Sequence, residues 1–96
     1  QIMELISTAG ESKSKAFEAL KKVKSKDFKG AKLLIEEARK IDIEAHRIQT
    51  ELITQDLNED VESPAMSLLM VHAQDHYMTS QLAKDLIEAL IYCLDK

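Results

Sequence analysis

The chain has 96 residues, a formal net charge of −4, and only two glycines and one proline. This length suits one small domain, residues 1–96, and the abundance of good helix formers predicts an all-α fold. Lysines and arginines are mixed with acidic residues and aromatics make up only 4% of the chain, which argues against nucleic-acid binding. The least charged stretch, 65–83, still holds two histidines and an aspartate, so no membrane insertion is expected. We expect a cytoplasmic protein, since its single cysteine excludes an internal disulfide.

The first helix is predicted over residues 1–25, where apolar side chains recur at spacings of three and four. The lysines of 21–26 suit the negative end of a helix dipole. Asp27 is placed to cap the helix that follows. The predicted buried stripe consists of Ile2, Leu5, Ile6, Ala9, Ala16, Leu20 and Val23.

The second helix is predicted over residues 28–55 and has the most regular pattern of the chain. Its apolar side chains alternate steps of three and four without interruption, which is a heptad seam. The members of this seam are Ala31, Leu34, Ala38, Ile41, Ala45, Ile48 and Leu52. The acidic stretch 55–62 that follows has no period and is interpreted as a loop.

A third helix is predicted over residues 65–95, with Ser63 as its N-cap and Pro64 in its first turn. It differs from the others in having two apolar stripes. One stripe comprises Leu69, Ala83, Leu86 and Leu90, and the other comprises Leu68, Val71, Met78, Leu82 and Ala89. A helix that is apolar on more than one side needs more than one partner, so we expect self-association of an antiparallel three-helix bundle.

Candidate chemistry is concentrated in the middle of this third helix. His72, Asp75 and His76 fall within about 100° of the helix circumference and therefore share one face. That face coincides with the apolar stripes, where an uncompensated carboxylate is unfavourable. Clustered titratable groups in an apolar setting favour a functional site.

Composition and spacing leave three interpretations open. In the first, a neutral histidine is a nucleophile that carries a phosphoryl group, with apolar neighbours that exclude water. In the second, His72 and His76 chelate a metal ion with Asp75 and His46, although the glutamate base of zinc hydrolases is absent. In the third, these groups are polar residues that fix the register of a non-catalytic oligomerisation module. His46 by itself is expected to be a packing or surface residue, and Cys93 a small buried hydrophobe.

At this helix the sequence resembles a known family. The run Val71-His72-Ala73-Gln74-Asp75-His76, followed by Met78-Thr79, is similar to the signature of the IIA component of the lactose/cellobiose (and chitobiose) class of the bacterial sugar phosphotransferase system. Segments 9–12, 16–21, 27–28, 44–53 and 67–71 resemble the same family, so the likeness covers nearly the whole chain. Tyr77 departs from it, since leucine is expected there.

The resemblance implies a homotrimer of three-helix bundles that works as a phosphohistidine carrier. It implies that His72 accepts a phosphoryl group from phosphorylated HPr and passes it to a cysteine of the IIB component, during uptake of a disaccharide of the lactose, cellobiose or chitobiose type. It implies that Asp75 of each subunit faces the trimer axis, where a divalent cation, expected to be Mg²⁺, binds. It further implies a supporting role for His76, and Gln74 is a further candidate for support.

Overall fold

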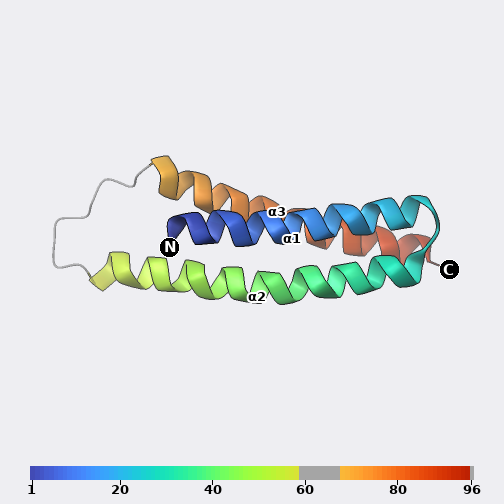
Figure 1. The fold of residues 1–96 in the computed structure, drawn as a ribbon, viewed down its shortest axis with the longest axis horizontal. Helices are drawn as coiled ribbons and strands as arrows, with labels where there is room; N and C mark the ends of the chain where they lie inside the picture. The colour runs from blue at the N-terminus through green and yellow to red at the C-terminus, as the bar shows by residue number, and fades with distance from the viewer. Residues whose placement is uncertain (59–67, 96) are drawn as a thin grey trace.

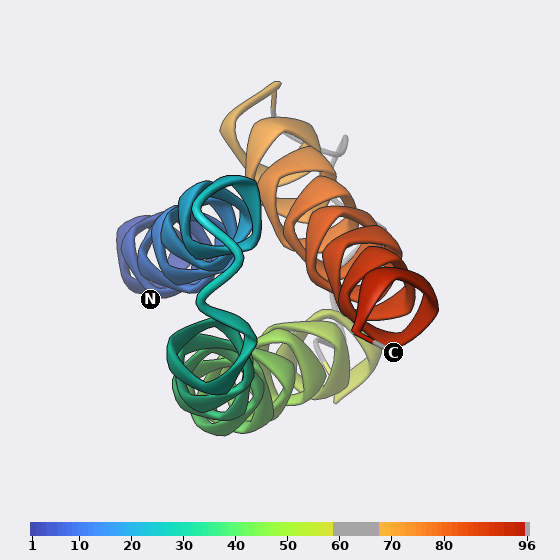
Figure 2. The ribbon, with the colours of Figure 1, turned by 90° about the vertical axis from the view of Figure 1, so that its right-hand side faces the viewer.

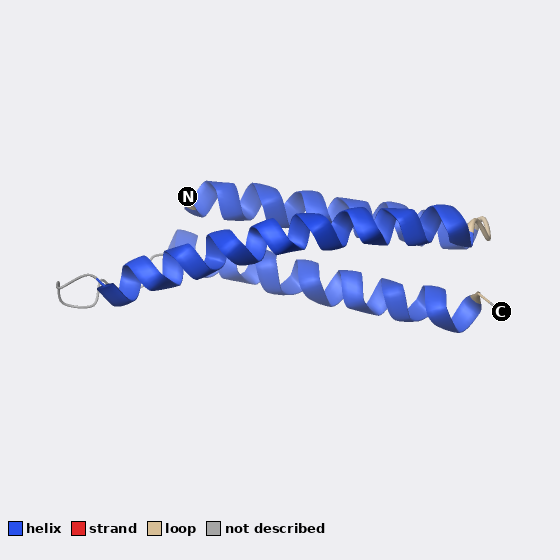
Figure 3. Ribbon diagram, turned by 90° about the horizontal axis from the view of Figure 1, so that it is seen from below, coloured by secondary structure: helices blue, strands red, loops and turns tan. Residues whose placement is uncertain are grey.

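Three long helices make up the described part of the chain, residues 1–58 and 68–95 of a computed structural model. Helix α1 spans Ile2–Lys24, α2 spans Phe28–Asn58 and α3 spans Leu68–Leu94. They run antiparallel along an elongated rod (Figure 1), and an end-on view places them at the corners of a triangle (Figure 2). Figure 3 shows helices and turns but no strand among the described residues. The predicted all-α antiparallel bundle is confirmed.

The turn between α1 and α2 forms as the local sequence predicts. The backbone N–H of Asp27 donates to the carbonyl of Lys22 at 2.8 Å, which satisfies one of the last carbonyls of α1. Asp27 then caps α2, since its Oδ1 accepts from the backbone N–H of Gly30 at 2.9 Å. A Cβ at position 30 would lie 2.5 Å from Asp27 Oδ2, so glycine leaves room for this cap.

The predicted seams of α1 and α2 bury most of their members. Two apolar clusters fill the bundle, one toward the N-terminal end of α1 and one toward its C-terminal end. The first contains Leu5, Ala9, Ala45, Ile48, Leu52, Ala73 and Tyr77. The second contains Ala16, Ala19, Val23, Ala31, Ile35, Ile87 and Ile91. Alanines recur in both clusters, and their small side chains allow the helices to approach closely.

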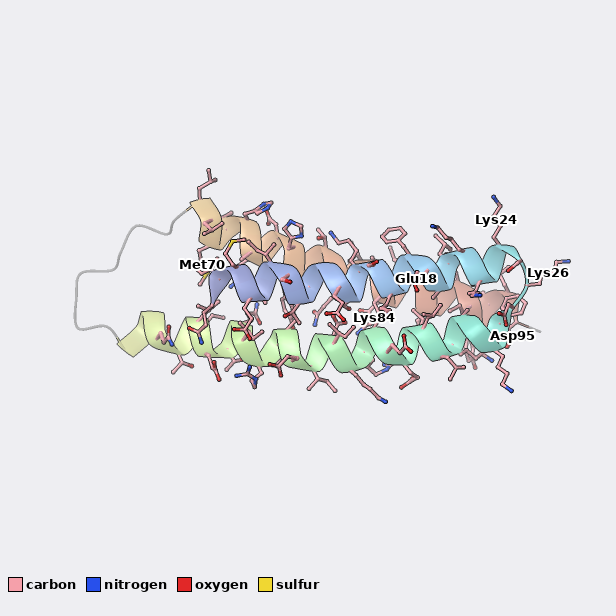
Figure 4. All side chains as sticks on the ribbon, in the orientation of Figure 1. Glu18, Lys24, Lys26, Met70, Lys84 and Asp95 are labelled. Carbon is pink, nitrogen blue, oxygen red and sulfur yellow. The ribbon has the colours of Figure 1, made fainter. Side chains whose placement is uncertain are left out.

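Four buried polar residues lie between the two apolar clusters, and we call them the polar belt: Ser12, Asp42, Ser80 and Lys84. Lys84 Nζ lies 3.1 Å from Asp42 Oδ2, and the Ser12 hydroxyl donates to Asp42 Oδ1 at 2.6 Å. Figure 4 shows Lys84 between the ribbons of α1 and α2. The belt therefore joins all three helices at one level of the bundle.

The inward face of α3 is not the one that the apolar stripes suggested. The side chains of α3 that are buried within the chain are Ala73, Tyr77, Ser80, Lys84, Ile87 and Ile91. Members of both predicted stripes are instead exposed: Leu68, Leu69, Val71, Met78, Leu82, Leu86 and Leu90. The prediction that two helices of the same chain leave apolar surface of α3 uncovered is confirmed.

The boundary at the end of α2 differs from the prediction. Residues 55–58 continue the helix instead of starting the loop. No glycine or proline interrupts the sequence there, so backbone hydrogen bonds extend the helix beyond the buried Leu52. The rest of the predicted loop, the Ser63-Pro64 cap and the first predicted residues of the third helix lie outside the described residues. Within the described part of the chain, the search for a helix long and apolar enough to cross a membrane finds no candidate.

Candidate functional site

Two histidines of α3 stand side by side on its surface. They are one helical turn apart, and their ring centroids are 4.5 Å apart with the planes at 89°, an edge-to-face contact. His72 is exposed and His76 is half-buried. The helix presents both rings on one side because residues at i and i+4 share a face. Their proximity, which the spacing predicted, is confirmed.

His72 lies in an apolar setting that is open to solvent. Together with Leu68 and Leu69 it lines a surface hollow at the N-terminal end of α3. Both leucines are exposed, with 86% and 44% of their surface accessible. An imidazole at such a place is reachable by a partner protein and has apolar neighbours that can exclude water once the partner is bound.

His76 is held in its neutral form by its surroundings. Burial lowers the pKa of His76 below its usual value of 6.5, and the electrostatic effects of His72 and Lys13 lower this pKa further, whereas Asp75 raises it. Its Nδ1 is buried and has no hydrogen-bond partner in the part of the chain that the structure describes. The ring of His72 is therefore in contact with an imidazole whose protonated form is disfavoured.

The hydroxyl of Thr79, one turn after His76 in α3, binds the ammonium group of Lys13 at the edge of the site. Thr79 Oγ1 donates to the carbonyl oxygen of Asp75 at 2.7 Å and lies 3.3 Å from that of His76. The same hydroxyl accepts a hydrogen bond from Lys13 Nζ of α1 at 3.1 Å. This contact could not be predicted from the spacing of residues, because Lys13 and Thr79 are 66 positions apart.

Asp75 lies on the uncovered side of α3. It is exposed, between the exposed side chains of Val71 and Met78. Its carboxylate takes part in none of the ion pairs among residues 1–58 and 68–95. The carboxylate is thus presented on an apolar helix face, where nothing described in its own chain compensates it.

The predicted alternative of a metal site within one chain is not supported. His46 lies on α2 and its Nδ1 is 3.0 Å from the hydroxyl of Tyr77, on the inward side of α3, away from His72. Across the described residues, no three His, Cys, Asp or Glu side chains come close enough to hold one ion. The predicted chelate of His72, His76, Asp75 and His46 therefore does not form within one chain. His46 contacts Tyr77 on the inward side of α3, whereas His72 and Asp75 lie on its exposed side.

Gln74 and Tyr77 belong to a hydrogen-bonded layer between α3 and α2. Gln74 Oε1 accepts from Gln49 Nε2 at 2.8 Å, so the side chain is directed to α2 in this structure. The Tyr77 hydroxyl also accepts from Gln81 Nε2 at 2.7 Å. Burial raises the pKa of Tyr77, as does the charge of Asp42, while Lys84 lowers it. The supporting role of Gln74 stays a prediction.

Two minor expectations have different outcomes. Cys93 is exposed, so its prediction as a buried hydrophobe is wrong: it lies on the outer side of the last turn of α3, next to the exposed Tyr92. Met70 packs against the first apolar cluster, as expected for core filler, and Figure 4 shows it beside the first turns of α1. Met78 is exposed on the uncovered face of α3.

Fold and site together define a small helical protein with an accessible histidine on an apolar helix face. The family model described as the PTS system lactose/cellobiose-specific IIA subunit matches residues 1–95. The chain therefore belongs to the lactose/cellobiose-specific IIA family of the sugar phosphotransferase system, whose members are phosphotransfer components.

Individual relatives agree with this assignment. The N,N'-diacetylchitobiose-specific EIIA component of Escherichia coli K12 is 44% identical over 95 residues, which cover 99% of this chain and 80% of the relative. The lactose-specific EIIA component of Staphylococcus epidermidis is 43% identical over 89 residues, 92% of this chain and 83% of the relative. A solved structure of the Escherichia coli IIA(chitobiose)–HPr complex superposes with a TM-score of 0.81 at 42% identity, covering 98% of this chain and 89% of the matched one.

Proposed function

We propose that this chain is a phosphohistidine carrier that takes a phosphoryl group from phosphorylated HPr on His72 and passes it to a cysteine of a IIB component. The observation that carries the proposal is an exposed imidazole in edge contact with a second imidazole that burial keeps neutral. The structure of a relative in complex with HPr supports HPr as the donor. The sugar served is a disaccharide of the lactose, cellobiose or chitobiose type, and the carrier works in the cytoplasm.

The first transfer exchanges one P–N bond for another. The lone pair of a His72 ring nitrogen attacks phosphorus and forms a new P–N bond, while the P–N bond on the donor histidine breaks and its electron pair stays on the donor ring. Each ring keeps the hydrogen on its other nitrogen, so no net proton is released. The reaction needs His72 unprotonated, and it needs water to be excluded from the apolar hollow beside Leu68 and Leu69.

The second transfer moves the phosphoryl group from nitrogen to sulfur. A cysteine thiolate of the IIB component attacks phosphorus, the P–N bond breaks, and its electron pair returns to the His72 nitrogen as a lone pair. Both partners must approach the same exposed ring. The solvent exposure of His72 is consistent with this requirement.

We further propose that the uncovered face of α3 is the interface of a homotrimer. Its exposed apolar residues Leu68, Val71, Met78 and Leu82 follow the heptad spacing of a helix–helix seam, and Asp75 interrupts them. In a trimer, one carboxylate from each subunit would meet at the axis. Oxygen ligands of this kind suit a divalent cation such as Mg²⁺, which would compensate the three charges.

The test is mass spectrometry of the intact chain after incubation with phosphorylated HPr. We expect an acid-labile gain of one phosphoryl group per chain. His72→Gln should show no gain while keeping the helical content of the unsubstituted chain by circular dichroism. A phosphorylated H72Q chain would contradict the assignment of the nucleophile.

A further inference from the structure

Lys13 is a cation that the fold places beside the histidine pair. It belongs to the middle of α1, is half-buried, and reaches across to α3, where its Nζ lies 3.1 Å from Thr79 Oγ1. Thr79 is itself fixed by its hydrogen bond to the carbonyl of Asp75. The ammonium is thereby held one helical turn beyond His76, on the side of α3 that faces α1.

The charge of Lys13 is not neutralised by a carboxylate in the described part of the chain. Two other lysines of the same helix are paired with acids: Lys15 lies 3.4 Å from Glu37, and Lys22 lies 3.9 Å from Asp27. Lys13 instead bonds to a neutral hydroxyl. Its charge also reaches the imidazole of His76, whose pKa it lowers. A half-buried ammonium without an acidic partner leaves a positive potential next to the two rings.

A phosphoryl group on His72 would bring negative charge and three acceptor oxygens to this place. Ammonium groups on long flexible stems are common phosphate ligands because they act as adjustable point charges. Fixed cations placed where charge arrives are effective in phosphoryl transfer, which depends mainly on positioning and electrostatic stabilisation. To contact such a group, the Lys13 stem has to rotate toward His72 and exchange its hydrogen bond to Thr79 for one to a phosphoryl oxygen.

We propose that Lys13 is a positioning residue for the phosphoryl group carried by His72, kept in place by Thr79 until the phosphoryl group arrives. This inference rests on the proposed function of His72. Lys13 attracts the incoming phosphoryl oxygens, aligns phosphorus with the His72 nitrogen and stabilises the phosphorylated form. It contributes a contact that α3 by itself cannot supply.

The experiment is rapid-quench phosphoryl transfer from phosphorylated HPr to this chain. Lys13→Met retains the length of the side chain without its charge, and it should lower kcat about tenfold or more with a smaller change in KM. Lys13→Arg should restore most of the rate, because it restores the charge. The matched control is Lys15→Met, which removes a paired lysine of the same helix and should change the rate less than twofold.

A second readout separates positioning from a structural role. In phosphorylated K13M, the ³¹P resonance of the phosphohistidine should shift and its hydrolysis should accelerate. The melting temperature of K13M should be no lower than that of K15M. An unchanged kcat in K13M, failure of Lys13→Arg to restore the rate, or a rise in KM alone would overturn the inference. If the unsubstituted chain and K15M are not phosphorylated at all, the proposed function of His72 fails, and the inference fails with it.

Discussion

The ion pair between Lys84 and Asp42 gives the sharpest prediction about stability. Both side chains are almost completely buried, with 9% and 4% of each residue accessible, and the charged atoms are 3.1 Å apart. Replacing Lys84 with Met retains the apolar stem but removes the cation. Asp42 then stays in the bundle centre with the Ser12 hydroxyl as its remaining described hydrogen-bond donor.

The expected loss is large because the remaining charge is uncompensated. Breaking a buried ion pair by removing one partner destabilises proteins by about 3–5 kcal/mol. For a domain of 60–100 residues, each kcal/mol corresponds to about 4–8 °C in Tm, so Lys84→Met should lower Tm by about 12 °C or more. The solvent-accessible pair of the half-buried Lys15 and the exposed Glu37 is the control, and K15M should lose less than about 1 kcal/mol.

Removing both charges should reverse the effect. In the double variant Lys84→Met/Asp42→Leu no buried charge is left among the described residues, and apolar replacement of buried ion pairs is often neutral or stabilising by about 1–4 kcal/mol. Ser12 keeps a partner in this variant, because its hydroxyl is also 3.1 Å from the carbonyl of Ala38. Leucine has the branching of aspartate and approximates its shape.

The assay is thermal and urea unfolding followed by circular dichroism at one fixed protein concentration, since self-association makes Tm depend on concentration. We expect the Tm of K84M to lie far below that of the unsubstituted chain, and the Tm of the double variant to lie close to that of the unsubstituted chain. A K84M chain that melts like K15M would refute the reasoning about uncompensated burial. A double variant less stable than K84M would also refute it, since Asp42 would then stabilise the fold by an interaction other than its charge pairing with Lys84.

Three further predictions concern the site and the trimer. In the proposed homotrimer, Asp75→Leu should keep the trimeric state by sedimentation, melt at a higher temperature in chelator and lose any dependence of Tm on divalent metal, because it removes like charges that would meet at the axis. The variant should still be phosphorylated, whereas a monomeric variant would show a stabilising contact of Asp75 instead. His76→Ala should slow phosphoryl uptake without abolishing it, measured by quenched transfer, and complete loss would point to a nucleophilic role for His76. Zinc-selective chelation should leave uptake unchanged, since the described residues form no three-ligand cluster; a loss that zinc restores would favour a metal site.

Much of the architecture could be predicted from local rules. The stripes of α1 and α2 are mainly apolar, so their periodicity identifies the buried face directly. The cap at Asp27 follows from its position before a helix, and it forms as predicted. The pairing of His72 with His76 follows from helix geometry, since residues four apart share a face whatever surrounds them. The family follows from the motif at 71–76.

The inward face of α3 depends on tertiary structure. Its buried residues repeat at steps of four and three, but Ser80 and Lys84 stand in the middle of that seam, while more apolar residues lie on either side. A pattern of apolar and polar residues therefore assigns the wrong face. Only the arrangement of three helices shows that Asp42 and Ser12 lie opposite Lys84 and make its burial tolerable.

The charges around the candidate site also come from distant parts of the chain. Lys13 reaches Thr79 across 66 positions, and His46 reaches Tyr77 across 31. Both contacts connect side chains on different helices, so their formation depends on the angle and register at which the helices pack. The sequence by itself determined which helix holds the histidines and which residues share their face. The tertiary structure decided which charge lies beside them, because the spacing along one helix carries no information about what the neighbouring helices bring to it.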